Sequence, residues 1–313
     1  MSKVLRIGTR ESQLAVWQAT LVQNLLKENG AQSELVYIKT EGDLDTITPL
    51  YALGVQGVFT KTLDSALLNN RIDIAVHSMK DVPTQLAQGI QQAAVLKRAS
   101  HKDIFVFKAG ADFLNDFNSE ATIATSSIRR IAQWLHRYPN HKVENIRGNV
   151  NTRLRKVQEN NWQGAIFAAA GLERIQSRPE NSVDLDWMLP APAQGAIMVA
   201  CRLEDHFAFE SCHSFNDEPT ALCTKIERDF LKILLGGCST PISALAEIKN
   251  GEVYMKGNIM SPDGIQKVEI EKRITVGGAV DLGEKAAIEI LLQGGQQIID
   301  NIREKGLLSN GEV

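Results

Sequence analysis

Basic residues gather in the middle of the sequence. The stretch from Thr125 to Lys156 contains eight Lys and Arg residues and a single acid, which leaves seven excess positive charges. Arg129 and Arg130 follow the hydroxyl-bearing run Thr125-Ser126-Ser127, at a point where a predicted strand turns into a predicted helix. Free N–H groups at a helix start, hydroxyl groups and guanidinium groups can together bind an anion.

A second strand-to-helix turn carries Arg147 just before Gly148. Both turns are expected at the carboxyl edge of a sheet, where open α/β sheets bind ligands. The guanidinium group of arginine favours bidentate binding of carboxylate or phosphate groups. The sequence has neither a Walker loop nor a GxGxxG run after a strand, so a small polycarboxylate fits better than a nucleotide. The alternative is a solvated basic surface without a ligand.

One acid stands out among these bases. Asp81 lies in the segment His77-Ser78-Met79-Lys80-Asp81-Val82-Pro83, directly after a predicted buried strand. A carboxylate held ionised by nearby cations can bind N–H donors or stabilise a developing positive charge. The structural alternative is a turn or capping aspartate before the proline. His77 and Ser78 do not form a convincing hydrolytic triad, because no suitable acid accompanies them.

Cys238 has the most unusual surroundings of the four cysteines. It lies in Gly236-Gly237-Cys238-Ser239-Thr240-Pro241, a glycine-flanked loop that follows a predicted helix and ends in a proline. Such a thiol can be accessible, although nothing nearby in the sequence activates its sulfur, and a buried structural cysteine is the alternative. The cysteines form no CxxC pair, and the spacing of Cys and His fits no zinc pattern. We therefore expect neither a disulfide framework nor a bound metal.

The overall composition disfavours several classes of protein. The 313 residues include 34 Lys and Arg and 37 Asp and Glu, so the chain has no global attraction for a polyanion. Aromatic residues make up only 6% and do not interleave with the basic stretch, which argues against nucleic-acid binding. No apolar run approaches the roughly 18 residues that cross a bilayer, and the first residues do not read as a secretory signal. These features favour a cytoplasmic protein with a small ligand.

Alternating strands and helices must position these residues. In the first part of the chain the hydrophobic pattern predicts strands at 4–8, 34–40 and 73–77 and helices at 14–25 and 59–68. A second series has strands at 104–107, 122–125, 143–146 and 165–169 and helices at 127–136 and 151–159. Repeated βα units indicate mostly parallel sheets. A buried strand at 196–201 can return to the first sheet, which would give two hinged lobes.

The remaining chain indicates a separate α+β domain. A helix from 218 to 235 is followed by three alternating strands, around 242–248, 253–259 and 267–274, and by a final helix. We therefore expect an α/β protein with lobe 1 in residues 1–96 and 196–215, lobe 2 in residues 97–195, and a C-terminal α+β domain in residues 216–313.

Six motifs, taken together and in order, resemble the porphobilinogen deaminase family, also called hydroxymethylbilane synthases. They are RIGTRESQLAVWQA (6–19), DIAVHSMKDVP (73–83), TSSIRR (125–130), IRGNVNTRL (146–154), AAGLER (169–174) and GGC (236–238). The match spans about residues 4 to 248, and the last 60 or so residues agree mainly in pattern. The resemblance implies two lobes similar to type II periplasmic binding proteins, with parallel-dominated mixed sheets joined by a double hinge.

The same resemblance implies an activity in tetrapyrrole (haem) biosynthesis. Members of this family carry a dipyrromethane cofactor on a loop cysteine, through a thioether bond, and that cysteine matches Cys238. They extend the cofactor by four porphobilinogen units into linear hydroxymethylbilane with release of ammonia. The resemblance further implies a monomer that passes its product to the next enzyme of the pathway.

Roles for the cleft residues follow from the matched motifs. Asp81 matches the catalytic carboxylate, which binds pyrrole N–H groups and assists proton transfer as the aminomethyl group departs and an azafulvene-like cation forms. Cofactor-binding roles are implied for Asp81, Cys238, Lys80, Ser127, Arg129 and Arg130. Substrate-binding roles are implied for Arg10, Ser12, Thr125, Ser126, Arg147, Arg153 and Arg174. Each added pyrrole brings two carboxylates, so an arginine-rich cleft suits a lengthening polyanion.

The sequence departs from the family pattern in a few places. Where many relatives have Gly-Gly-Lys-Gly, this chain reads Gly54-Val-Gln56-Gly57, and Gln56 cannot supply the charge of the usual loop lysine. The usual Gly-Gln-Gly near the second crossing reads Ala193-Gln194-Gly195.

A two-lobed binding protein for a small polycarboxylate is the alternative function. Asp81 and Cys238 discriminate against it, because a carboxylate receptor has no obvious use for either group.

Overall fold

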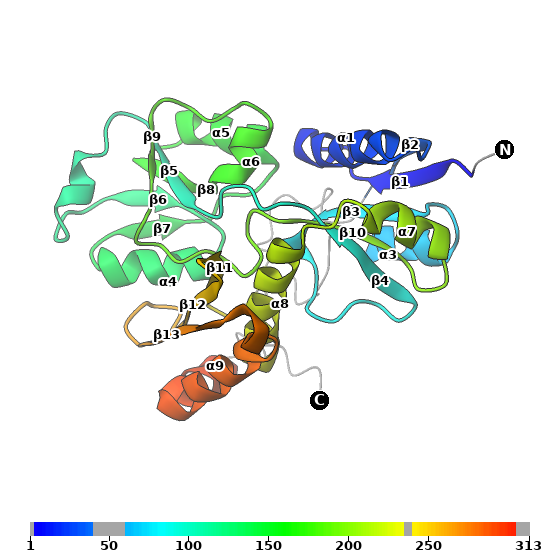
Figure 1. The fold of residues 1–313 in the computed structure, drawn as a ribbon. Coiled ribbons are helices and arrows are strands. Elements are labelled where there is room, and N and C mark those ends of the chain that lie inside the picture. The colour runs from blue at the N-terminus through cyan, green and yellow to red at the C-terminus, as the bar shows by residue number, and fades with distance from the viewer. Residues whose placement is uncertain (1–2, 40–59, 235–239, 305–313) are drawn as a thin grey trace.

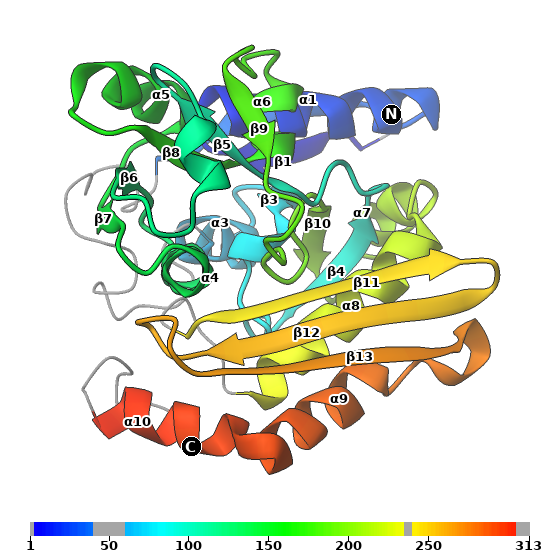
Figure 2. The ribbon, with the colours of Figure 1, turned by 90° about the vertical axis from the view of Figure 1, so that its left-hand side faces the viewer.

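Three regions make up the molecule. The computed structural model describes residues 3–39, 60–234 and 240–304. Two α/β lobes lie beside each other, and a third region with its own sheet and helices packs below them, with α8 (Glu218–Ile233) at the junction (Figure 1). Figure 2 shows that the third region's sheet spreads beneath both lobes.

The first lobe is built on a five-stranded mixed sheet. Its elements are β1 (Leu5–Thr9), α1 (Gln13–Glu28), β2 (Ser33–Tyr37), α3 (Lys61–Leu68), β3 (Ile74–Ser78), β4 (Ile90–Val95), β10 (Ile197–Arg202) and α7 (His206–His213). The strand order is β2-β1-β3-β10-β4, with β1 parallel to both neighbours and β10 antiparallel to both of its own. The central strand β3 is apolar and buried, and it leads directly into the short 3₁₀ turn Met79–Asp81.

The second lobe repeats this arrangement. Its elements are β5 (Asp103–Phe107), β6 (Thr122–Ala124), α4 (Ile128–Arg137), β7 (Lys142–Glu144), α5 (Val150–Glu159), β8 (Gly164–Ala168), α6 (Ala169–Arg174) and β9 (Ser182–Asp184). The strand order is β7-β6-β8-β5-β9, with β5 antiparallel to β8 and β9. In each sheet, therefore, the antiparallel strand is the one that enters from the other lobe. The expected pair of lobes with mixed sheets is confirmed.

Two crossing segments, 96–102 and 185–196, connect the lobes and run side by side. The Leu96 N–H donates to the Ile197 carbonyl at 3.0 Å, and the Ala99 N–H donates to the Gly195 carbonyl at 3.1 Å. Gly195 has φ +88°, and a Cβ there would lie 2.6 Å from the Ser100 carbonyl oxygen, so the close approach requires glycine.

A buried ion pair ties both crossings to the third region. The carboxylate of Glu227 on α8 is fully buried and accepts hydrogen bonds from Arg98 Nη1 (2.6 Å) and Nη2 (2.9 Å). It also accepts from the backbone N–H groups of Ala193 (2.6 Å) and Ala246 (2.7 Å). Ala193 has φ +61°, an unusual left-handed conformation for a residue with a side chain, and the Glu227 contact helps to hold it.

The third region packs helices on one face of an antiparallel sheet. Its elements are α8, β11 (Ile242–Lys249), β12 (Glu252–Met260), β13 (Lys267–Thr275), α9 (Leu282–Ile290) and α10 (Gln296–Glu304). Apolar residues of all three helices and the sheet form one core. The expected final helix is divided, because the segment Leu291–Gly295 forms a π-helical turn in which Gly294 has φ +108°. In the three described ranges, no helix is long and apolar enough to cross a membrane.

Four elements were missing from the pattern-based prediction: β4, α6, β9 and α7. β9 has three residues, too few for a period, and β4 (Ile90–Val95) places Gln91 and Gln92 in its first half. α6 begins at Ala169, directly where β8 ends, and the strand predicted at 165–169 had included that residue. Pairing across the sheets, rather than local pattern, determines the two strands β4 and β9.

Candidate active site

A cavity of about 1010 Å³ lies where the two lobes and the third region meet. Lobe 1 contributes Arg10, Ser12, Lys80 and Asp81, and lobe 2 contributes the two strand-to-helix turns after β6 and before α5. Leu231, Thr240 and Ile242 close it from the third region. Its volume is at the upper end of the roughly 300–1,000 Å³ typical of small-molecule sites, so a ligand with several linked rings can be accommodated.

The charged residues that line the cavity are mostly cations. Two of them, Glu11 and Asp81, are acids. Ten are basic: Arg10, Lys39, Lys80, Arg129, Arg130, Arg147, Arg153, Arg155, Lys156 and Arg174. Such a wall favours a ligand with several negative charges. Six of the eight basic residues between Thr125 and Lys156 therefore line a cavity, and the solvated-surface alternative applies only to Arg137 and Lys142, which do not line it.

The structure brings eleven of the thirteen predicted site residues to this cavity. They are Arg10, Ser12, Lys80, Asp81, Ser126, Ser127, Arg129, Arg130, Arg147, Arg153 and Arg174. Thr125 is buried behind the wall and does not line it; its hydroxyl accepts a hydrogen bond from the Ser127 N–H at 3.3 Å. Cys238 lies outside the described residues, as does Gln56.

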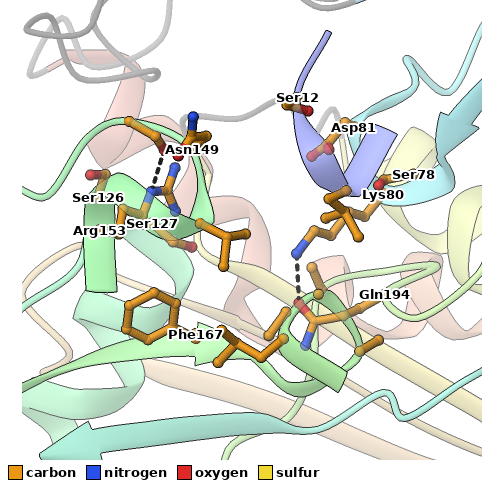
Figure 3. A pocket seen from close by; sticks show the side chains of 18 of the residues that line it. Ser12, Ser78, Lys80, Asp81, Ser126, Ser127, Asn149, Arg153, Phe167 and Gln194 are labelled. Atoms are coloured by element: carbon orange, nitrogen blue, oxygen red, sulfur yellow. Dashed lines mark hydrogen bonds between the residues drawn. The ribbon is translucent and has the colours of Figure 1, made fainter. Parts of the chain in front are cut away.

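Asp81 ends the 3₁₀ turn that follows β3, and its side chain is exposed to the cavity. Within the described residues this carboxylate makes no hydrogen bond or ion pair, so its oxygens can receive N–H donors from a ligand. Figure 3 shows Asp81 beside Ser12 on the lobe 1 side, across the cavity from Ser127 and Arg153. Its negative charge favours the charged forms of Lys80 and Arg153.

Lys80 points away from Asp81, toward the second crossing. Its Nζ donates to Oε1 of Gln194 at 3.2 Å (Figure 3). Burial, together with the charge of Arg130, lowers the pKa of Lys80 to about 8. The ammonium group is therefore charged at neutral pH and loses its proton in mildly alkaline solution.

Arg129 and Arg130, at the start of α4, share a protein carboxylate. Both donate to Asp103, whose side chain is fully buried at the start of β5. Burial alone would raise the pKa of Asp103, but the two arginines and Lys80 lower it to about 2. Sequence analysis expected both guanidinium groups to bind ligand carboxylates. In the structure they line the cavity while they are also paired with Asp103.

The remaining lobe 2 residues form the turns themselves. The Ser126 hydroxyl donates to the Ile146 carbonyl and accepts from the Ile146 N–H at 3.1 Å, so this serine joins the two turns. The side chain of Asn149 caps α5 by accepting from the Thr152 N–H. Arg153 Nε donates to the Gly148 carbonyl at 2.7 Å (Figure 3), and burial with nearby arginines lowers the pKa of Arg153 to about 10.

Arg174 connects lobe 2 to its surroundings. Its Nη2 donates to the Gly195 carbonyl at 2.7 Å, and its guanidinium lies 5.8 Å from the centre of the Trp17 ring in lobe 1. On the lobe 1 side, the Ser12 hydroxyl caps α1 by accepting from the Ala15 N–H at 3.4 Å. Arg174 and Ser12 therefore stabilise the local structure of the cavity wall, in addition to any contact with a ligand.

Three cysteines are described, and all are buried and free. Burial raises the pKa of Cys201 and of Cys223 to about 11, and it also raises the pKa of Cys212. These thiols stay protonated and are poor nucleophiles. Among the residues that the structure describes, no group of three or more His, Cys, Asp and Glu side chains could hold a metal ion.

Sequence reasoning missed three polar residues of the site. Asp103 and Gln194 fix the basic side chains, and the buried hydroxyl of Thr240 has no hydrogen-bond partner among the residues that the structure describes. Asp103 carried a signal that could have been used, because a lone acid opening an apolar strand needs a buried partner. Gln194 and Thr240 carried none, because amides and hydroxyls are common in loops.

Comparison with known proteins places the chain in a family. The family model "Porphobilinogen deaminase, dipyromethane cofactor binding domain" matches residues 5–210, and the model of the C-terminal domain of the same family matches residues 221–292. The chain is 39% identical over 305 residues to porphobilinogen deaminase of Pelobacter propionicus, which covers 96% of this chain and 98% of that protein. It is also 39% identical over 307 residues to porphobilinogen deaminase of Trichlorobacter lovleyi, with 97% and 98% coverage.

The structural comparison found several solved structures with low sequence identity to this chain. The methionine binding protein MetQ matches with a TM-score of 0.42 at 12% identity, over 67% of this chain and 88% of that chain. The VFT2 domain of Bordetella pertussis BvgS matches with a TM-score of 0.41 at 13% identity, over 67% and 85%. The two family models and the full-length relatives decide the assignment: the chain belongs to the porphobilinogen deaminase family.

Proposed function

We propose that this chain joins four porphobilinogen molecules head to tail into linear hydroxymethylbilane, with release of ammonia, as a step of tetrapyrrole biosynthesis. A dipyrromethane bound through a thioether to Cys238 primes the reaction. The observation that supports this proposal best is the position of Asp81. It is an exposed carboxylate without a hydrogen bond within the described residues, in a cavity whose other charged lining residues are mainly cations.

The residues present fit a dipyrromethane. Such a group carries several carboxylates and pyrrole N–H donors, and the cavity offers ten cations and the Asp81 carboxylate. Thr240, two residues after Cys238, has a buried hydroxyl in the cavity wall that finds no partner in the described parts of the chain, and a polar ligand group would satisfy it. We propose that Lys80, Asp81, Ser127, Arg129 and Arg130 hold the cofactor. When bound, the cofactor supplies the pyrrole carbon to which the first porphobilinogen is joined.

Two tasks fall to the chain's own residues. As the C–N bond of the protonated aminomethyl group breaks, ammonia leaves with the bonding electron pair and the positive charge passes to the porphobilinogen ring. The Asp81 carboxylate accepts hydrogen bonds from pyrrole N–H groups and stabilises that charge. Arg10, Ser12, Ser126, Arg147, Arg153 and Arg174 bind the acetate and propionate groups of the substrate and the growing chain. Because Thr125 does not line the cavity, we assign it to support of the turn instead.

The wider setting follows from the same proposal. We propose lobe boundaries at 1–96 with 196–215 and at 97–195, a C-terminal domain from 216, and a monomer that passes its product to the next enzyme. A cytoplasmic location would keep the Cys238 thiol reduced, which thioether formation requires.

The alternative is a binding protein for a small polycarboxylate. Product analysis separates the two functions: purified protein is incubated with porphobilinogen, and substrate consumed and ammonia released are both measured. We expect one ammonia per porphobilinogen, with continued turnover and a linear tetrapyrrole product. Binding that saturates at a fixed stoichiometry, with no ammonia released, would favour the alternative.

A further inference from the structure

An acid that does not line the cavity holds two of the arginines that do. Asp103 Oδ1 accepts from Arg130 Nε (3.0 Å) and Nη2 (2.7 Å), and Oδ2 accepts from Arg129 Nη2 (2.7 Å). Each guanidinium is anchored a second time: Arg129 Nη1 donates to the Leu189 carbonyl at 2.7 Å, and Arg130 Nη1 donates to the Ile166 carbonyl at 3.0 Å. Two anchors fix the plane of each guanidinium, so its free N–H groups have a set direction.

Gln194 extends this network to the opposite lobe. Its Nε2 donates to Asp103 Oδ1 at 3.0 Å and to the His101 carbonyl at 2.8 Å, while its Oε1 accepts from Lys80 Nζ at 3.2 Å. Only this orientation of the amide satisfies all three partners, because a flipped amide would face an ammonium with donors and a carboxylate with an acceptor. Gln194 is 1% exposed and stands in the second crossing, between Lys80 of lobe 1 and Asp103 of lobe 2.

We propose that Asp103 and Gln194 are positioning residues for carboxylate binding: Asp103 directs Arg129 and Arg130 into the cavity, and Gln194 holds Lys80 beside them from the other lobe. This inference rests on the proposed function and deepens it. Three neighbouring cations repel one another, and a buried anion offsets part of that repulsion while it fixes their geometry. Cations held in place before the ligand arrives bind it with a smaller entropy loss.

The chain offers a matched control for a purely structural role. Asp73 is also an aspartate with a buried side chain that pairs with two arginines, Arg6 (Nε, 2.9 Å) and Arg202 (Nη2, 2.9 Å). Neither Asp73 nor its two arginines line the cavity. Loss of charge at Asp73 and at Asp103 should therefore disturb the fold in similar ways and differ in ligand binding.

The test compares full-length Asp103→Asn and Asp73→Asn chains prepared without the cofactor. Their melting temperatures are recorded first. Covalent attachment of the cofactor after addition of porphobilinogen, called loading below, is then followed by intact mass at a temperature where both variants are folded. We expect both variants to melt at lower temperature, with loading at least about tenfold slower in Asp103→Asn and at the wild-type rate in Asp73→Asn. Equal loading rates in the two variants would overturn the positioning role.

A second variant covers the case in which Asp103→Asn does not fold. Gln194→Met keeps the side-chain volume and adds no charge, and it removes the hydrogen bonds to Lys80 and Asp103. We expect slower loading in this variant, and wild-type loading would overturn the proposal. A wild-type chain that gains no mass would contradict the proposed function and this inference together. A wild-type chain that loads, with variants that load equally fast, would contradict this inference alone.

Discussion

Replacement of Glu227 by Gln tests how the three regions are held together. The Glu227 carboxylate is fully buried and accepts four hydrogen bonds, two from Arg98 and two from backbone N–H groups of Ala193 and Ala246. Glutamine has nearly the same shape, but it has one acceptor oxygen and puts N–H donors against donors. It also leaves the Arg98 guanidinium buried without its counter-charge.

The expected loss of stability is large. Removal of one partner from a buried ion pair costs about 3–5 kcal/mol, a substantial part of the roughly 5–15 kcal/mol that stabilises a typical domain. We expect the melting temperature to fall by on the order of 10 °C. Urea unfolding followed by circular dichroism gives the free energy change. The control is Glu271→Gln, which removes one partner of the exposed Lys256–Glu271 pair and should cost less than about 1 kcal/mol.

A double-mutant cycle isolates the pair itself. Arg98→Met combined with Glu227→Gln should be less destabilised than the sum of the two single variants by at least about 1 kcal/mol, because the double variant buries no unpaired charge. A loss below about 1 kcal/mol in Glu227→Gln, or strictly additive effects in the cycle, would refute the view that this ion pair joins the crossings to the third region.

Three further outcomes are expected. The Asp81→Asn variant should fold normally but turn over porphobilinogen about 10²–10⁴-fold more slowly. The control variant Asp112→Asn changes an exposed aspartate and should keep full turnover. Full turnover in Asp81→Asn would contradict the catalytic assignment. Thr240→Val should leave the stability of the cofactor-free chain unchanged or raise it by about 1 kcal/mol, and it should reduce the extra stability that the chain gains on loading. Thermal melting measures both effects. An unchanged gain on loading would show that the hydroxyl does not contact the cofactor. Burial and Arg130 lower the pKa of Lys80 to about 8, so loading of the cofactor-free chain should slow as the pH rises through 8. A Lys80→Met chain should load slowly at every pH. The same pH profile in both chains would exclude Lys80 as the source of the pH dependence.

Local sequence patterns were sufficient for much of the fold and for the site's composition. The strand-to-helix turns at 125–128 and 147–150 were indicated by the short apolar runs before them and the helical patterns after them, and the charge count in this stretch already indicated an anion site. The βα alternation, with a late strand at 196–201, indicated a chain that crosses twice between lobes. These features are local in sequence, so pattern and propensity capture them.

Partners distant in sequence were not predictable in this way. Asp103 is paired with Arg129 and Arg130 only because β5 enters antiparallel beside β8, which brings its first residue under the start of α4. Gln194 meets Lys80 across 114 positions of sequence, and only the side-by-side crossings bring them together. Thr125 does not line the cavity, because its hydroxyl accepts a hydrogen bond from the N–H of Ser127 in the same turn. The residue type alone does not indicate which way this side chain points.

The intact mass of the purified protein tests the central claim most directly. Denaturing mass spectrometry of the wild type and of the Cys238→Ser variant shows whether a group is covalently attached and whether this thiol carries it. We expect an added mass equal to two linked pyrroles derived from porphobilinogen on the wild type, and none on the variant. A wild-type chain that remains unmodified after incubation with porphobilinogen would contradict the account and favour a binding protein.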